Sequence, residues 1–149
     1  MIHLDDKDHR ILQVLNDHAE YTTRNIAKQA RLPITTVHNR IKKLRSQGII
    51  KRYTIVKDYE KLGYPVAAYI LIDASLKELK EKHRTQADLV KTLTSMSFVE
   101  EAAIVTGQND IVLKVRLSTL KDLNSCLLEK IQVLDGVERT QTLVIMNEV

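Results

Sequence analysis

Residues 22–53 decide the fold of this 149-residue chain and read TTRNIAKQARLPITTVHNRIKKLRSQGIIKRY. The opening threonine can cap a helix with its hydroxyl, and apolar side chains at helical spacing predict a short helix over 22–31. Pro33 disfavours helix at the residue before it but suits the first turn of a new one, so a second helix is expected over 34–47. Gly48 then ends that helix.

A longer helix is expected before this helix pair, and a strand after it. Ile11, Leu12 and Leu15 recur at helical spacing, and three aspartates lie where the helix dipole favours negative charge, which predicts a helix over 5–18. The run 49–56 is rich in β-branched residues and predicts a strand. Two short helices joined by a tight turn, between a supporting helix and a strand, are the parts of a winged helix-turn-helix.

Charge is distributed unevenly along the chain. Residues 21–57 hold ten lysines and arginines and no aspartate or glutamate. Up to Leu62 there are 13 basic and 7 acidic residues, and after it 10 and 12, so the net charge of +4 divides into +6 and −2. A solvated basic surface is the alternative, but the exclusion of acids over so long a stretch favours a surface that binds nucleic acid.

The helix expected over 34–47 has two unlike faces. At about 100° per residue, Val37, Ile41 and Leu44 fall on one narrow side. The opposite side carries hydroxyls, an amide, an imidazole and cations, which can contact base edges and phosphates in the major groove. Cations outside this helix are expected to contact phosphates and to contribute affinity more than sequence selectivity. The residues predicted to contact DNA are Arg24, Thr35, Thr36, His38, Asn39, Arg40, Lys42, Lys43, Lys51 and Arg52.

Two side chains in this stretch need a separate interpretation. His38 is either a DNA contact or an exposed surface histidine. Tyr53 is expected to pack in the wing and not to stack on a base, because no second aromatic residue accompanies it.

Gly63, Tyr64 and Pro65 interrupt the pattern in a chain that has only four glycines and two prolines. We therefore expect two domains, 1–62 and 63–149. Apolar patterns in the second domain predict the order βαββαβ, a ferredoxin-like unit with helices on one face of an antiparallel sheet, so the fold class is α+β. The predicted elements are a strand over 66–74, a helix over 86–96, strands over 99–106 and 111–117 joined by a turn at 107–110, a helix over 119–134 and a strand over 137–146.

The second face of this sheet carries more apolar surface than a small domain can leave in water. Two cations solvate part of this face, but Val112, Val144 or its neighbour Leu143, and the apolar run 66–72 remain. Dimerisation across this face or its edges is therefore expected. The charged stretch 77–84 is expected to be a solvated loop or the start of a helix, without a functional role.

No catalytic, metal-binding or cofactor-binding motif is found in the sequence. Cys126 is the only cysteine, so neither an internal disulfide nor a thiolate metal site can form. No apolar run reaches the roughly 18 to 20 residues that a membrane helix needs, and residues 1–10 are too charged for a signal peptide. We therefore expect a cytoplasmic, non-enzymatic protein without a metal or cofactor.

Several short motifs resemble the Lrp/AsnC, or feast/famine, family of transcription regulators, and their order and spacing carry the resemblance over almost the whole chain. The run 4–12 resembles the opening helix of the family. The motifs that resemble its helix-turn-helix and wing are Ile26-Ala27, Thr36-Val37, 40–44, 48–50 and Tyr53, and those that resemble its effector domain are Thr106-Gly107 with Asp110, and Val137 with Thr140, Thr142 and 144–146.

The resemblance implies a DNA-binding regulator whose C-terminal RAM-type domains form homodimers and often tetramers or octamers. It also implies an amino acid effector held between dimers. Backbone amides and hydroxyls suit an α-carboxylate, and a carboxylate suits an α-ammonium group. A turn residue that satisfies its own hairpin is the alternative for Asp110. By family position, the effector site is expected at Ile104, Gly107, Asp110, Thr140, Val144 and Ile145.

Three positions depart from the family pattern. Pro33 stands where a serine usually begins the recognition helix, so the helix start must be formed without that cap. Asn25 replaces an acid that commonly completes a capping box, which loses a capping contact and also a negative charge that DNA would repel. Asn39 replaces a common basic residue, so the preferred DNA target is expected to differ from that of relatives.

Two other functions are compatible with the same fold. A DNA-packaging protein would bind all DNA alike, and the turn 107–110 would be purely structural. A sirohaem decarboxylase, a group that resembles this family in fold, would use histidine and arginine side chains around a tetrapyrrole. The enzyme is less favoured because the outward helix face is polar and basic and the histidines form no motif, at His3, His9, His18, His38 and His83.

Overall fold

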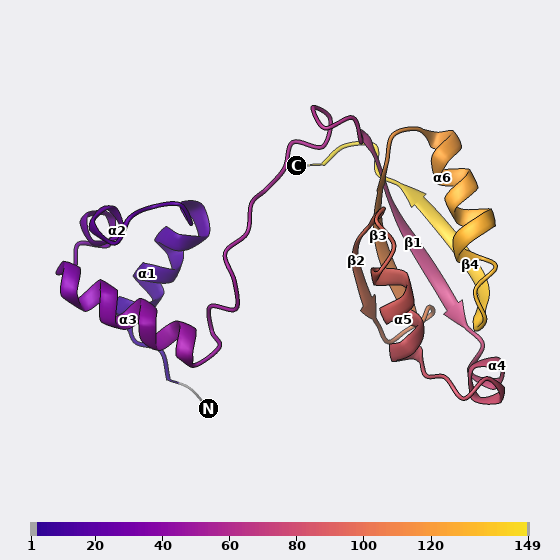
Figure 1. The fold of residues 1–149 in the computed structure, drawn as a ribbon, viewed down its shortest axis with the longest axis horizontal. Coiled ribbons are helices and arrows are strands. Elements are labelled where there is room, and N and C mark those ends of the chain that lie inside the picture. Colours follow the sequence, from indigo (N-terminus) through magenta and orange to yellow (C-terminus); the bar gives the residue numbers. More distant parts are fainter. Residues whose placement is uncertain (1–2, 149) are drawn as a thin grey trace. The chain divides into compact units, whose positions relative to one another are not determined.

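The computed structural model describes residues 3–148, which fall into two compact units, one up to Val56 and one from Lys57 onward. The first unit is a bundle of three helices whose apolar faces meet in one core around Ile11, Val37 and Leu44. The two predicted short helices and the longer helix before them are confirmed. They are α1 (Asp6–Asp17), α2 (Thr23–Ala30) and α3 (Ile34–Ser46), drawn in Figure 1.

Local sequence sets the ends of α2 and α3. The Thr22 hydroxyl accepts a hydrogen bond from the backbone N–H of Asn25 at 3.3 Å, so the predicted cap is confirmed. No side chain caps α3, which begins directly after Pro33. Gly48 follows α3 with a φ of 71°, a left-handed conformation that glycine adopts without strain.

The strand predicted over 49–56 is wrong. Its residues form no β-ladder, and Ile55 and Val56 are exposed. The β-branched residues favour extended backbone, but a strand needs a partner to take up its N–H and C=O groups. Within residues 3–56, the unit consists of helices and offers no second strand.

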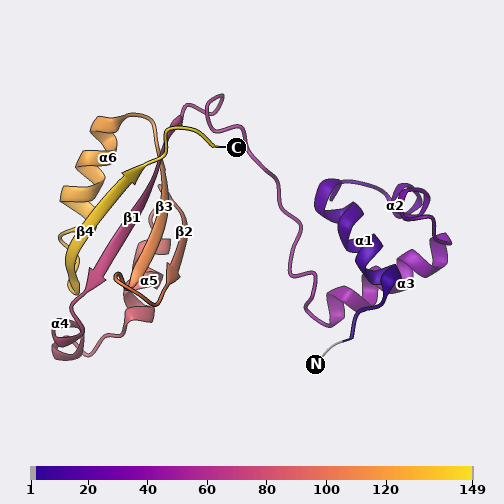
Figure 2. The same cartoon turned by 180° about the vertical axis from the view of Figure 1, so that it is seen from behind.

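The second unit is a four-stranded antiparallel sheet in the order β2-β3-β1-β4, with α5 and α6 covering one face (Figures 1 and 2). Strand order and helix placement confirm the predicted ferredoxin-like βαββαβ unit. Its elements are β1 (Val66–Ala74), α4 (Leu76–Glu81), α5 (Gln86–Thr94), β2 (Val99–Ile104), β3 (Ile111–Leu117), α6 (Leu120–Cys126), a π-helical turn η1 (Leu127–Ile131) and β4 (Val137–Val144).

The alternation predicted for β3 is confirmed. Ile111, Leu113 and Val115 are fully buried on the face that the helices cover. Lys114 and Arg116 alternate with the buried residues and point to the other face, where both pair with Glu100 of β2 and with Glu148, which follows β4. The sheet therefore has one apolar face and one mixed face.

The helices of the second unit are shorter than the patterns predict. The helix expected over 119–134 is divided into α6 and the π-helical turn η1. The charged stretch 77–84 overlaps the short helix α4, whose Leu79 is buried in the core of the unit. None of the helices within residues 3–148 is both long and apolar enough to cross a membrane.

The division between the units lies before the predicted boundary at Leu62. The Arg116 guanidinium lies over the Tyr59 ring, 4.3 Å from its centroid. This cation–π contact ties the segment after Lys57 to β3, so these residues belong to the second unit.

Candidate nucleic-acid interface

The α3 helix is anchored by its apolar side and exposes the opposite one. Val37 and Leu44 are almost completely buried against α1 and α2. The outward side chains at Thr35, Asn39 and Lys43 are exposed. Thr36, near the edge of the buried side, is half-buried. A hydroxyl, an amide and a cation are therefore presented together on a rigid helix.

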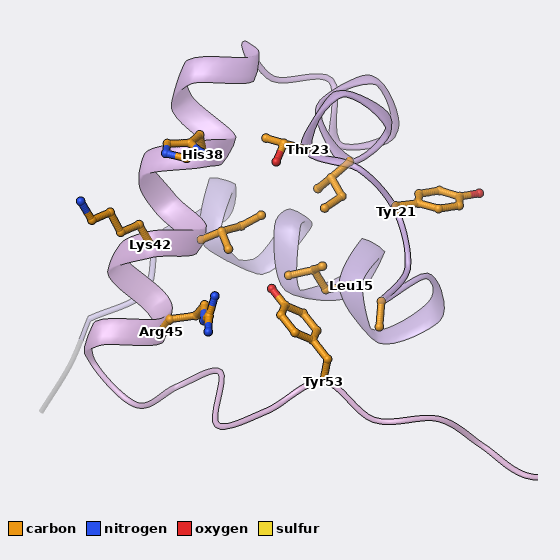
Figure 3. Close-up of a pocket in the computed structure, with 10 residues that line it drawn as sticks. Leu15, Tyr21, Thr23, His38, Lys42, Arg45 and Tyr53 are labelled. Carbon is orange, nitrogen blue, oxygen red and sulfur yellow. The ribbon is translucent and has the colours of Figure 1, made fainter.

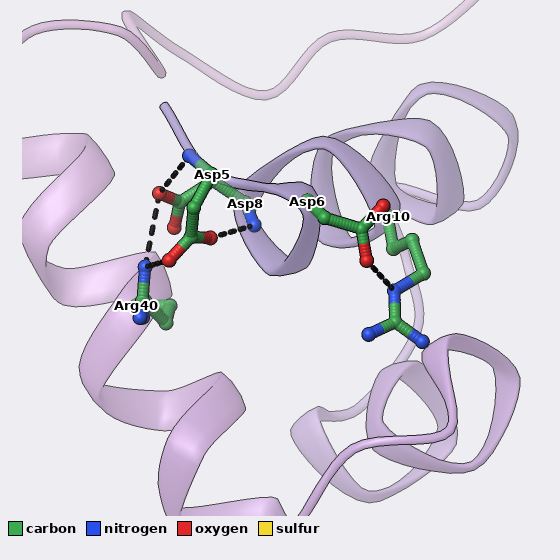
Figure 4. Close-up of polar contacts among 5 residues, drawn as sticks. All are labelled: Asp5, Asp6, Asp8, Arg10 and Arg40. Atoms are coloured by element: carbon green, nitrogen blue, oxygen red, sulfur yellow. Dashed lines mark hydrogen bonds and ion pairs between the residues drawn. The ribbon is translucent and has the colours of Figure 1, made fainter. Parts of the chain in front are cut away.

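Arg40 occupies a different position from the other predicted contacts. Its Nη1 lies 2.6 Å from an Asp5 oxygen and 3.0 Å from an Asp8 oxygen, as Figure 4 shows. Asp5 and Asp8 cap α1 reciprocally, and Asp8 is only 2% exposed. The backbone N–H of Asp8, together with Arg40, lowers the pKa of the Asp5 carboxyl. Arg40 thus holds α3 against the start of α1, and a DNA contact through its other N–H groups stays a prediction.

Arg10 forms an ion pair within α1 and a hydrogen bond from α1 to α2. Arg10 Nε lies 3.1 Å from an Asp6 oxygen (Figure 4). An Arg10 guanidinium N–H also donates to the carbonyl of Ala30 at the end of α2. The acidic residues of this unit are thus concentrated on α1, away from the outward side of α3.

The remaining predicted cations are unpaired within residues 3–148. Arg24 lies in the first turn of α2, and Lys51 and Arg52 follow α3; all three are exposed, and none forms an ion pair in the described part of the chain. Lys42 and Lys43 on α3 are also exposed and form no ion pair in this part of the chain. Unpaired, solvated cations are available to displace counterions from a phosphate backbone.

Sequence reasoning missed a cavity beside α3. Figure 3 shows that Arg45 on α3 points toward the Tyr53 side chain, and His38 and Lys42 from the same flank of α3 also line the cavity. Its volume is about 500 Å³. The spacing of 38, 42 and 45 along a helix was the available signal. The lining residues are Leu15, Ala19, Tyr21, Thr23, Ile26, His38, Ile41, Lys42, Arg45 and Tyr53.

In the second unit, Asp110 closes the turn between β2 and β3. Its carboxylate accepts hydrogen bonds from the Ala74 backbone N–H at 2.8 Å and from Gln86 Nε2 at 3.1 Å. Asn109 beside it donates to Asp73 at 2.7 Å. Gln86, Asn109 and Asp73 could not be identified from sequence patterns, because their hydrogen-bond partners are distant in the chain.

The predicted effector residues lie at two ends of the sheet within one unit. Ile104 pairs with Ile111, which pairs with Ile72, which pairs with Thr140, so these residues form a row beside Asp110 and Gly107. Val144 pairs with Ala68, and Ile145 donates to Ala67, at the other end of β1. Thr140 and Val144 are four residue steps apart along β4, a distance of about 13 Å.

The described geometry defines a class of protein. A helix-turn-helix unit with an exposed, polar and cationic second helix, joined to a ferredoxin-like unit, is the arrangement of a DNA-binding regulator with an appended sensory domain. Residues 4–51 match the model of winged helix-turn-helix DNA-binding domains, and residues 72–149 match that of the Lrp/AsnC ligand binding domain. The chain belongs to the Lrp/AsnC family of DNA-binding transcriptional regulators.

Individual relatives agree with this assignment. The regulatory protein AsnC of Haemophilus influenzae is 37% identical over 146 residues, which cover 98% of this chain and 93% of the relative. The HTH-type transcriptional regulator FL11 of Pyrococcus abyssi is 34% identical, over 97% of this chain and 91% of the relative.

Solved structures have the same fold. The structure of E. coli AsnC is similar with a TM-score of 0.83 and 30% identity, over 99% of this chain and 95% of that chain. A Neisseria meningitidis transcriptional regulator, solved as a complex with L-Met, has a TM-score of 0.86 at 22% identity, over 99% of this chain and 92% of that chain.

Proposed function

We propose that this regulator binds specific double-stranded DNA sequences through the outward side of α3, in the cytoplasm and without a catalytic role. The observation that supports this proposal is the stretch 21–57, whose ten cations are accompanied by no acid. Thr35, Thr36 and Asn39 are proposed to select bases, and His38, Lys42 and Lys43 to contact bases or phosphates. Arg24, Lys51 and Arg52 are proposed to position the protein on the phosphate backbone.

Assembly of the C-terminal units is part of this proposal. Tyr69 and Leu143 lie on the sheet face that the helices leave open and are 40% and 45% exposed, with half-buried Leu71 and Val112 beside them. An apolar patch on a sheet face is stabilised when a second copy covers it. We propose a homodimer through this face and higher assembly to a tetramer or octamer.

An amino acid effector is proposed for the C-terminal units. The similar Neisseria regulator was solved with L-Met, and residues 72–149 match a ligand-binding domain. We propose that the row formed by Ile104, Gly107, Asp110 and Thr140 contributes one part of the site. Because Val144 and Ile145 lie at the other end of the same sheet, they are proposed to complete a site from a neighbouring copy.

Selection from a random-sequence DNA library tests the DNA-binding proposal. We expect a defined motif to be enriched and to bind more tightly than its shuffled sequence, and log affinity to fall linearly with log salt by about 0.9 for each phosphate contacted. Equal affinity for the selected and shuffled duplexes would contradict sequence-specific regulation and would instead support DNA packaging.

Replacing Asp110 by Asn tests the effector proposal. The variant keeps an oxygen that can accept from the Ala74 N–H, so the turn is retained, but it loses the charge that would pair with an α-ammonium group. In thermal-shift titrations against the twenty amino acids, a ligand at 100 times its Kd stabilises the unaltered protein by about 2.7 kcal/mol. We expect Asp110→Asn to abolish that shift and Asp73→Asn, in β1 where the carboxylate accepts from Asn109, to keep it; an equal shift in both variants would refute the role of Asp110.

A further inference from the structure

The cavity beside α3 combines an apolar floor with a cationic rim. Leu15 of α1, Ile26 of α2 and Ile41 of α3 form the floor, and the first two are buried. His38, Lys42 and Arg45 stand on one flank of α3 at the rim (Figure 3). None of the ten lining residues is an aspartate or glutamate.

The polar groups at the rim have no partners in the part of the chain that the structure describes. The side chains of His38, Lys42, Arg45 and Tyr53 take part in no hydrogen bond or ion pair between residues 3 and 148. The Arg45 guanidinium lies 6.0 Å from the centre of the Tyr53 ring, and Figure 3 shows the Tyr53 hydroxyl directed toward the cavity. The Arg45 guanidinium and the Tyr53 hydroxyl are therefore directed toward the cavity, with His38 and Lys42 at its rim and no acidic side chain among the lining residues.

Cavity size and charge together specify the ligand class. A volume of about 500 Å³ lies within the range of small-molecule sites. An inorganic anion or a backbone phosphate would use the rim but would leave the apolar floor in contact with water. An organic carboxylate with a ring-sized apolar body uses both, since its carboxylate forms charge-assisted hydrogen bonds and its body displaces water from the floor.

We infer that this cavity binds a small organic carboxylate with an apolar body, at a site within the DNA-binding unit. The consequence for DNA rests on the proposed function, because His38 and Lys42 belong both to the rim and to the proposed DNA contacts. A bound carboxylate offsets part of the positive charge of the lysine and arginine at this rim and lowers DNA affinity. The cavity is thus a second ligand site that controls DNA binding, in addition to the effector site proposed for the C-terminal units.

Calorimetric titration of the full chain without DNA tests the site itself. The probe is 3-phenylpropionate, and 3-phenylpropionamide and inorganic phosphate are the comparisons. We expect saturable binding of the carboxylate and at least tenfold weaker binding of the neutral amide and of phosphate. Equal binding of the amide would refute the anion requirement, and equal binding of phosphate would refute the role of the floor.

Matched variants locate the probe. Arg45→Gln removes one rim cation that is not among the proposed DNA contacts, and Ala19→Leu places an isobutyl group into the cavity; each is expected to weaken 3-phenylpropionate about tenfold or more. Lys43→Gln removes an equal charge from the other flank of α3 and is expected to leave its Kd unchanged.

Isoleucine methyl spectra of the full chain distinguish this site from one in the C-terminal unit. Binding is expected to shift the Ile26 and Ile41 signals and to leave that of Ile111 unchanged. The opposite pattern, or Lys43→Gln weakening the probe as much as Arg45→Gln, would overturn the inference. A DNA competition is run separately, so that failure of DNA binding does not affect the result for the site.

Discussion

Replacing Gly136 by Ala is expected to lower the free energy of unfolding by about 3 kcal/mol. Gly136 has a φ of 90°, which is strained for any residue with a side chain. A Cβ at this position would also lie 2.6 Å from Cγ of Leu79, a side chain that is only 1% exposed and belongs to the core of the unit. Denaturant unfolding of the full chain, followed by circular dichroism, measures the loss.

Gly48→Ala is the matched control for this substitution. Gly48 also has a positive φ, of 71°, but an added Cβ meets no atom within 4 Å, so only the backbone strain of about 1 kcal/mol is expected. Adding Leu79→Ala to Gly136→Ala should make the double substitution less destabilising than the two single losses added together. If the two glycine variants lose equal stability, steric contact with Leu79 is not the cause.

Helices and strands were predictable from the sequence where apolar residues recur with one clear period. The alternation over 111–117 and the helical spacing in α1 and α3 each reflect burial of one face, and burial is what the structure shows. The contact of Gly136 with Leu79 was not predictable. Leu79 lies in the stretch 77–84, whose charges indicated a solvated segment, and only the packing of α4 against the sheet buries it.

The segment 49–56 shows the limit of local propensity. Its β-branched residues favour a strand, and the prediction failed because strand formation depends on a partner that sequence spacing does not reveal. Ile55 and Val56 are exposed for the same reason, because no neighbouring strand covers them.

In the candidate site, the helical periodicity predicted which side of α3 is exposed. It did not predict the partners of the side chains at the edges of that side. Arg40 lies between the buried and outward sides, and its partner Asp5 is 35 residues away in the chain. The helix dipole explains aspartates at the start of α1, but it does not predict that the capping-box residues Asp5 and Asp8 pair with Arg40. The spacing of residues within one helix cannot predict contacts with another helix. The pairing of Arg40 with α1 was therefore not predictable.

Replacing Asn39 by Ala is expected to weaken binding to the selected DNA motif by tenfold to a hundredfold, about 1–3 kcal/mol. Asn39 is exposed on the outward side of α3, where its amide can pair with adenine. Affinity for the shuffled duplex and the slope of log affinity against log salt are expected to stay unchanged, because the side chain carries no charge. Fluorescence anisotropy titrations on both duplexes measure these quantities.

Lys51→Gln is expected to show the opposite pattern. Lys51 is exposed, has no acidic partner within residues 3–148, and follows the helix that contacts bases, so its loss should weaken both duplexes equally. One released counterion fewer reduces the salt slope by about 0.9. If Asn39→Ala weakens both duplexes alike, α3 contributes affinity without selection. The acid-free stretch 21–57 would then be explained equally by a DNA-packaging surface, because cations alone do not distinguish DNA sequences.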